Sequence, residues 1–145
     1  MKQFIESLED FTWENYKTIS DALVMFDDSN IELEMQRQPT IYSYYHALMS
    51  LAKKTVNDIE ADNVRVASTI RSSYRNNSKV GNKLTAEDLD DQVFADEQYI
   101  AATRKLNEAS FKYELLKGLV RALEQKKDML QQVSANKREE TKLYK

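Results

Sequence analysis

A single stripe of mostly apolar residues constrains the fold of this chain more than any other feature. It repeats in steps of three and four residues over about nine helical turns. Its members are Ile41, Tyr45, Leu48, Ala52, Val56, Ile59, Asn63, Val66, Ile70 and Tyr74. A helix of that length reaches roughly 50 Å, which is typical of a strut or coiled coil. The stripe therefore predicts one long helix over residues 40–76.

Few residues in the chain can interrupt a helix. Its 145 residues include 2 Gly and 1 Pro, so few turns are available to build a sheet. Pro39 fixes its own φ and lacks an N–H group, so we expect the long helix to begin just after it, at about Thr40. The composition predicts an all-α fold, and the length suits a single domain.

Two segments precede the predicted long helix. Apolar side chains between Phe4 and Phe26 recur with a helical period, which predicts an amphipathic N-terminal helix within residues 1–28. The polar residues 27–30 should end it, because their side chains compete for backbone hydrogen bonds. In residues 31–35 apolar residues alternate with glutamates, which predicts an extended or one-turn connector.

A second long helix is predicted over residues 86–138, after a polar loop at 77–85. Thr85 and Asp88 have the spacing of a capping box, which places the helix start. The helix then keeps a heptad repeat, and residues 139–145 should fray. The repeat comprises Ala95, Ala102, Ala109, Leu116, Leu123 and Leu130 at one position and Tyr99, Leu106, Tyr113, Val120, Lys127 and Ser134 at the other. We thus expect two long antiparallel helices and a shorter N-terminal one.

A second apolar stripe on the last helix predicts self-assembly. It consists of Phe94, Phe111, Leu115 and Leu119. A helix that is apolar on two faces must bury both, and one three-helix chain offers few surfaces to cover them. We therefore expect a homo-oligomer held together by Tyr99, Leu106, Phe111, Tyr113, Leu116, Val120, Leu123 and Leu130. Gly118 inside this helix indicates either close backbone approach or a tolerated defect that costs about 1 kcal/mol.

Residues 63–86, here called the basic run, are strongly cationic within an acidic chain. They contain no Asp or Glu and carry a net charge of +5, against −7 for residues 1–62 and −1 for residues 87–145. Cations can meet phosphates, and a tyrosine ring can stack on a base. The run therefore predicts a site for single-stranded nucleic acid, formed by Arg65, Arg71, Tyr74, Arg75, Lys79 and Lys83. The alternative is a solvated helix end whose cations complement the helix dipole.

Several kinds of chemistry have no support in the sequence. The chain has no Cys, and its only histidine, His46, has no metal-binding or catalytic pattern around it. Gly81 and Gly118 are the only glycines, so there is no glycine-rich phosphate loop. The acids of residues 87–97 suit the start of a helix better than a cation site. We expect a non-enzyme without metal or cofactor. Without an apolar run of ~18 residues or a signal peptide, it should be soluble, intracellular and unattached to membranes.

Short segments along the chain resemble the UvsY family of recombination mediators from T-even and related phages. They are Ile41-Tyr42-Ser43, Lys53-Lys54, Ile59-Glu60-Ala61, Val66-Ala67, Arg71 to Tyr74, and Ala95-Asp96 after a Gly-containing loop. The similarity lies in their order and spacing over roughly residues 31–140. It implies an all-helical ring, often described as a heptamer, that binds single-stranded DNA in the cytoplasm of a phage-infected bacterial cell. Such proteins help a RecA-like recombinase, UvsX in that family, load onto DNA covered by single-strand binding protein.

The resemblance assigns DNA binding to Arg71 and Tyr74 alone. The family pairs a Lys and an Arg just before an aromatic residue. Here Thr69 or a neighbour stands in place of one of these two basic residues, and Arg75 follows the aromatic residue. The other basic residues are assigned to DNA binding only because their charges cluster in the basic run. The N-terminal helix looks longer than the family's, which leaves its role open. The alternative function is a structural coiled-coil or scaffold protein without DNA binding.

Overall fold

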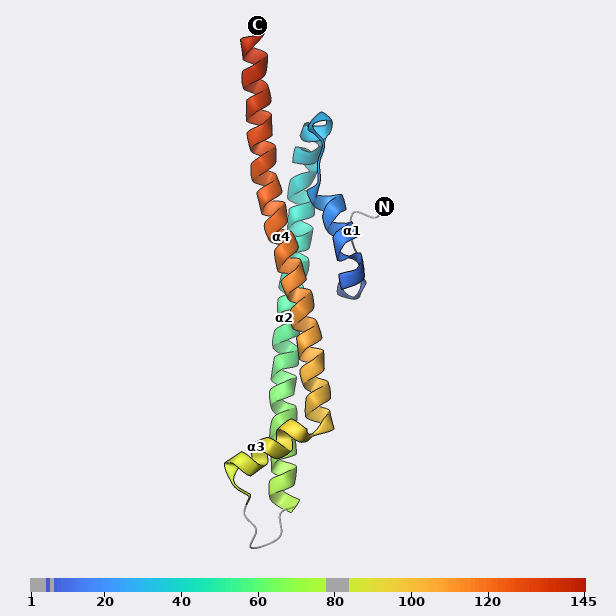
Figure 1. Ribbon diagram of the computed structural model, residues 1–145, viewed down its shortest axis with the longest axis vertical. Coiled ribbons are helices and arrows are strands. Elements are labelled where there is room, and N and C mark those ends of the chain that lie inside the picture. The colour runs from blue at the N-terminus through green and yellow to red at the C-terminus, as the bar shows by residue number, and fades with distance from the viewer. Residues whose placement is uncertain (1–4, 6, 78–83) are drawn as a thin grey trace. The chain divides into compact units, whose positions relative to one another are not determined.

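The computed structural model describes residues 5, 7–77 and 84–145. Their elements, in chain order, are a 3-10 turn at Leu8–Asp10, α1 at Trp13–Val24, a 3-10 turn at Asp28–Asn30, α2 at Ile31–Asn77, α3 at Ala86–Ala95 and α4 at Glu97–Leu143 (Figure 1). The described residues contain helices and no strand, so the all-α prediction is confirmed. They form two compact units: unit 1 comprises Met1–Ala52 and Lys112–Lys145, and unit 2 comprises Lys53–Phe111.

The N-terminal helix is shorter than the sequence predicted. α1 begins at Trp13 because Thr12 and Asn15 cap it reciprocally. The Thr12 N–H group donates to Asn15 Oδ1 at 2.9 Å, and the Asn15 N–H group donates to Thr12 Oγ1 at 3.4 Å. Phe11 lies before this cap and is fully buried without being helical. Part of the apolar period therefore belongs to a chain segment that packs in an irregular conformation; Phe4 lies outside the described residues.

The predicted connector at 31–35 and the predicted helix start at Thr40 are both wrong. α2 already begins at Ile31, after a 3-10 turn in which the Ser29 N–H group donates to Asp27 Oδ1 at 3.1 Å. Pro39 therefore lies inside the helix, where a missing N–H group costs about 3 kcal/mol. Ile31 and Ile41, on either side of Pro39, are 5% and 3% exposed. Burial of these side chains offsets the proline, which lies on the exposed side.

The helix predicted over residues 86–138 is two helices. Asp96 has an extended backbone, with φ −73° and ψ 131°, and separates α3 from α4. Its carboxylate accepts a 2.8 Å hydrogen bond from the Gln98 N–H group, so it acts as the N-cap of α4. The capping box at Thr85 is present as predicted. α4 then continues to Leu143, through the tail that was expected to fray.

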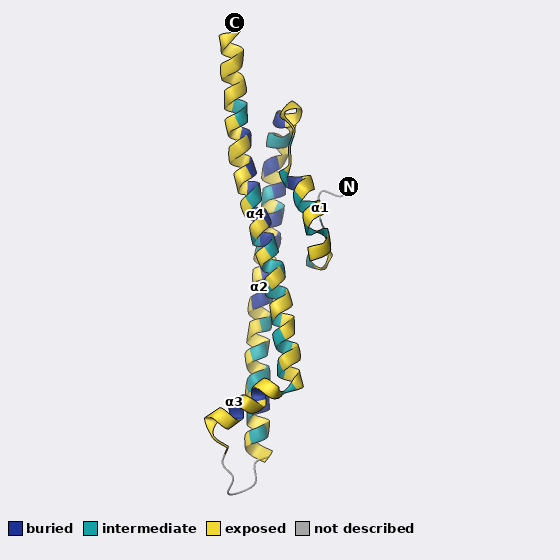
Figure 2. Cartoon of the chain, in the orientation of Figure 1, coloured by how far each residue is buried: buried dark blue, intermediate teal, exposed yellow. Residues whose placement is uncertain are grey.

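Unit 1 holds a core formed by α1, the first part of α2 and the second part of α4. The core residues are Phe11, Leu23, Ile41, Tyr45, Leu48, Ala52, Leu116, Leu119, Val120 and Leu123. Figure 2 shows the buried positions of α2 and α4 recurring along one side of each helix. The stripe predicted from Ile41 to Tyr74 is buried or half-buried at every position. The helical period of the sequence thus identified the packed face of α2.

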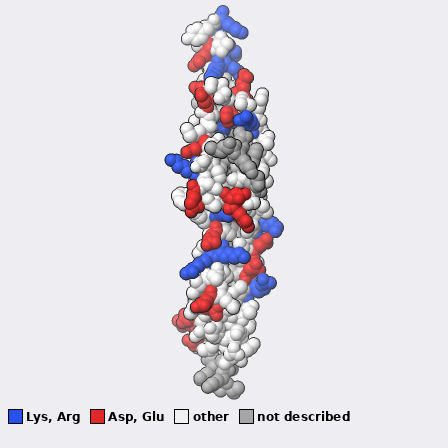
Figure 3. Space-filling model, turned by 90° about the vertical axis from the view of Figure 1, so that its right-hand side faces the viewer, with Lys and Arg blue, Asp and Glu red and all other residues white. Residues whose placement is uncertain are grey.

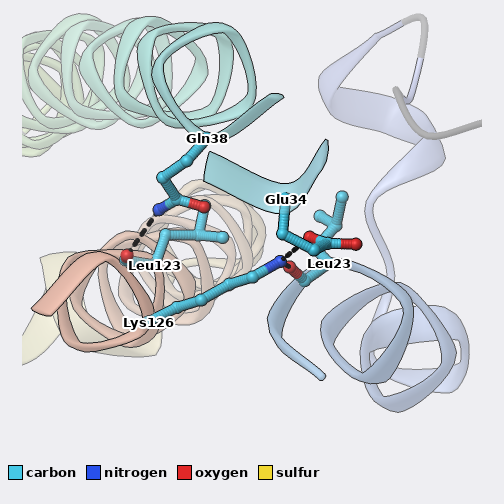
Figure 4. Close-up of polar contacts among 5 residues, drawn as sticks. All are labelled: Leu23, Glu34, Gln38, Leu123 and Lys126. Atoms are coloured by element: carbon cyan, nitrogen blue, oxygen red, sulfur yellow. Dashed lines mark hydrogen bonds and ion pairs between the residues drawn. The ribbon is translucent and has the colours of Figure 1, made fainter. Parts of the chain in front are cut away.

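A buried cation links the three helices of unit 1. The Lys126 side chain is 1% exposed, and its Nζ donates to the Leu23 carbonyl and to Glu34 Oε2, both at 2.6 Å (Figure 4). Next to it, Gln38 Nε2 donates to the Leu123 carbonyl at 2.6 Å. The heptad placed Lys127 on the packed face, but Lys127 is exposed and Lys126 faces inward. The buried face of α4 is therefore displaced by one residue at this turn.

Candidate nucleic-acid interface

The described part of the basic run lies in unit 2 and is concentrated at the end of α2. Arg71 and Arg75 are four residues apart, so they lie on one face of the helix. Arg65 points about 120° away from Arg71 around the helix axis, as 3.6 residues per turn require. Lys79 and Lys83 lie outside the described residues. The structure therefore brings together Arg71, Tyr74 and Arg75 and places Arg65 on another face.

Arg65 takes part in an ion pair within its own helix. Its Nη2 lies 2.9 Å from Asp62 Oδ1, and the two side chains are 77% and 62% exposed. An exposed pair of this kind contributes about 0.2–1 kcal/mol. Because this ion pair is weak, Arg65 can exchange the Asp62 carboxylate for a phosphate at a small cost in free energy.

Arg71 pairs with an acid from a different helix. Its Nη2 donates to Asp90 Oδ1 of α3, and the two side chains are 40% and 47% exposed. Figure 1 shows α3 crossing α2 near the C-terminal end of α2. Leu89 and Val93 anchor α3, because they are 4% and 2% exposed. The basic run contains no acid in the sequence, but in the folded chain Asp90 of α3 lies next to it.

Tyr74 and Arg75 differ in exposure. Tyr74 is half-buried and continues the packed stripe that includes Ile70, which is 5% exposed. Its ring is therefore shared between packing and solvent, and a base could reach only the solvent side. Arg75 is exposed in the last turn of α2, where a cation also complements the helix dipole.

The acidic start of α3 is held in place by its cap. Asp88 Oδ2 accepts hydrogen bonds from the Thr85 hydroxyl at 2.8 Å and from the Thr85 N–H group at 3.1 Å. These two bonds lower the pKa of Asp88, the side-chain bond most. Figure 3 shows Lys and Arg side chains interspersed with Asp and Glu on the face in view. The candidate interface is thus a small cationic cluster beside a fixed acidic helix.

Half of the residues predicted to mediate oligomerisation are buried inside the chain itself. Leu116, Val120, Leu123 and Leu130 are at most 4% exposed within unit 1, where α1 and α2 accompany α4. We assign them to the intramolecular core. Tyr99, Leu106 and Tyr113 are half-buried, and Phe111 is 53% exposed. The α4 face around Leu119 packs in the same core as side chains of α1, so this part of the second apolar stripe is covered within the chain.

Unit 2 exposes a set of large apolar side chains. They are Val64, Leu84, Phe94, Ile100 and Phe111, with exposures from 36% to 64%. Phe94 also meets the ring of Tyr99, with centroids 5.7 Å apart. The second apolar stripe contributes Phe94 and Phe111 to this set. Val64 and Ile100 were not singled out by the sequence, because neither belongs to one of the predicted apolar stripes.

Two further residues singled out in the sequence have ordinary structural roles. An added Cβ at Gly118 would meet Tyr16 Oη at 3.8 Å, an ordinary contact with a side chain. Gly118 is therefore a tolerated defect and not a point of close backbone approach. His46 is exposed and lies against the Tyr42 ring, with centroids 5.7 Å apart. Among the described residues no cluster of three metal-ligating side chains occurs.

Comparison with protein-family models, with curated proteins and with solved structures finds no match to this chain. In the described ranges, none of the helices combines the length and the apolarity that crossing a lipid bilayer requires.

Proposed function

We propose that this chain is a recombination mediator that binds single-stranded DNA and helps load a RecA-like recombinase onto DNA covered by single-strand binding protein. The observation that carries the proposal is the grouping of Arg71, Tyr74 and Arg75 in the last turns of α2. The resemblance to the UvsY family selects two of these three residues. The proposed role is binding and remodelling without catalysis, and no metal or cofactor takes part.

The three residues contribute to DNA binding in different ways. Arg71 and Arg75 neutralise phosphates, and each such contact adds up to about 0.7 to the slope of log affinity against log salt on single strands. Tyr74 offers the solvent side of its ring to a base, which is worth ~1–3 kcal/mol without releasing counterions. Removing Arg71 or Arg75 should therefore change the salt dependence of binding. Removing the Tyr74 ring should lower the affinity without changing the salt dependence.

Assembly into a ring, which the resemblance puts at seven subunits, would multiply this small site. The exposed apolar side chains of unit 2 support contacts between copies, because Phe94 and Phe111 are 60% and 53% exposed. Tethered sites raise overall affinity about 10²- to 10⁴-fold without new contacts. A strand held by several copies would be stretched away from single-strand binding protein and presented to the recombinase.

A fluorescence anisotropy titration with labelled oligo-dT at low and raised salt tests the proposal. The variant Arg71→Ala/Arg75→Ala should weaken binding and flatten the salt slope. A matched control is Arg104→Ala/Lys105→Ala, which removes the same charge from exposed positions of α4 in unit 2. The control should bind nearly as wild type does, because its cations lie outside the basic run.

The ring contact of Tyr74 needs a variant that preserves packing. Tyr74→Leu keeps an apolar side chain on the half-buried face and removes the aromatic surface. Its affinity for oligo-dT should fall while its salt slope stays unchanged. If the salt slope of Tyr74→Leu falls as much as that of Arg71→Ala/Arg75→Ala, the substitution displaces the neighbouring arginines.

A structural coiled-coil or scaffold protein without DNA binding is the second candidate. One observation favours it: Arg65 and Arg71 already pair with Asp62 and Asp90. In that case the cations serve as solvated helix surface, and oligo-dT anisotropy should stay flat even at low salt. The same titration therefore separates the two candidates.

A further inference from the structure

We infer that α3 is a built-in competitor for DNA at the end of α2, with Asp90 holding the place on Arg71 that a phosphate would take. The inference rests on the proposed function and adds a residue that limits the affinity of that site. It follows from a contact between two helices that the sequence did not indicate, since Arg71 and Asp90 are nineteen residues apart.

The composition and anchoring of α3 suit this role. Its ten residues include four acids, Glu87, Asp88, Asp90 and Asp91, and no Lys or Arg. Leu89 and Val93, 4% and 2% exposed, fix the helix by its apolar face. The capping box fixes its first turn. Asp90 therefore keeps its place beside Arg71, whereas an acid on an unstructured tail would move away.

The Arg71–Asp90 pair is exposed enough to be exchanged. With side chains 40% and 47% exposed, water and salt screen the pair, and its strength is that of a surface contact. A phosphate that binds Arg71 must displace the Asp90 carboxylate. The displaced carboxylate then lies close to the strand and repels it. Binding at Arg71 is thus an exchange of one anion for another.

This exchange also changes the expected salt dependence. A phosphate that binds a free cation releases counterions from the DNA, with a slope of about 0.7 per contact on single strands. When the phosphate replaces a carboxylate, the freed carboxylate is no longer neutralised by the arginine and attracts cations from solution through its diffuse ion atmosphere. This attraction offsets part of the release. Arg71 should therefore contribute less to the salt slope than an arginine without a carboxylate partner.

The test compares two neutral substitutions on neighbouring residues of α3. Asp90→Asn removes the competing charge, whereas Asp91→Asn removes the same charge from an exposed residue for which the structure shows no bond to Arg71. Asp90→Asn should bind oligo-dT about two- to fivefold more tightly at low salt, the range that exposed ion pairs set. Its salt slope should steepen by at most about 0.7. Asp91→Asn should show a smaller gain, because only a longer-range, screened repulsion is removed.

A double-mutant cycle assigns the gain to Arg71. In an Arg71→Ala background, Asp90→Asn should bring no more improvement than Asp91→Asn does. Asp90→Glu, which keeps the charge, should bind within about twofold of wild type, and circular dichroism should show that every variant keeps its helices.

The outcomes separate the two proposals. If wild type binds oligo-dT but Asp90→Asn and Asp91→Asn behave alike, α3 is not a competitor at Arg71 and the inference is wrong. A gain from Asp90→Asn that persists without Arg71 contradicts it equally. If wild type does not bind single-stranded DNA at all, the proposed function fails, and this inference fails with it.

Discussion

Replacing Lys126 with methionine should strongly destabilise the chain, although lysine is a residue type that is usually exposed. The substitution keeps the aliphatic part of the side chain, which fills the core beside Leu123 (Figure 4). It removes the Nζ group that donates to the Leu23 carbonyl and to Glu34. Glu34, whose side chain is 19% exposed, then keeps a charge without its cation.

The magnitude follows from the two partners that are left behind. Breaking a buried ion pair from one side costs about 3–5 kcal/mol, because the remaining charge is uncompensated. Leaving a buried carbonyl without its donor costs about 1–3 kcal/mol. Part of the first cost is relieved because Glu34 retains some contact with water. We therefore expect a loss of roughly 3–4 kcal/mol in the free energy of unfolding.

Urea unfolding followed by circular dichroism measures this loss. Lys127→Met is the matched control, because the Lys127 side chain is 58% exposed and its removal should change stability by no more than about 0.5 kcal/mol. The double variant Lys126→Met/Glu34→Gln should recover part of the loss by removing the orphaned charge. Equal midpoints for Lys126→Met and Lys127→Met would refute the assignment of Lys126 as the buried link between α1, α2 and α4.

Three further outcomes follow from the structure. Gly118→Ala should raise the free energy of unfolding by about 0.5–1 kcal/mol in the same urea assay, because the added methyl meets only an ordinary contact. Because hydrogen bonds from Thr85 lower the pKa of Asp88 below 3.8, its stabilising effect on α3 is full above that pH and is lost as pH falls through the lowered pKa. NMR titration of Asp88 should show a higher pKa in Thr85→Ala. Phe111→Asp should dissociate the proposed oligomer in sedimentation experiments while helicity persists, whereas Leu123→Asp should also unfold unit 1, since Leu123 is fully buried.

Features encoded by local sequence were predictable. The packed face of α2 follows from the 3.6-residue period, and the start of α3 follows from the side chains of Thr85 and Asp88, which satisfy backbone groups only a turn away. The position of Pro39 was misjudged because its local cost is real but smaller than the burial of the residues around it. Propensity is overridden where tertiary packing is dense.

Features that depend on distant partners could not be predicted. Nothing in the sequence distinguishes Lys126 from a solvated lysine. The carbonyl and the carboxylate that allow its burial reach it only because α1, α2 and α4 pack together. The candidate site shows the same limit. The basic run was identified from charge alone, but the carboxylate of Asp90 reaches Arg71 only because α3 folds back across α2. The sequence also did not show that the extended backbone of Asp96 separates α3 from α4.

A salt-dependent titration of labelled oligo-dT with wild type and with Arg71→Ala/Arg75→Ala tests the proposed function most directly. Wild type should bind, with an affinity that falls as salt rises. The double variant should bind more weakly and with a lower slope, the decrease staying below about 1.4, the value for two full phosphate contacts. Sedimentation should show that both proteins have the same assembly state. If the double variant retains wild-type affinity and slope at every salt concentration, the end of α2 is not the DNA site.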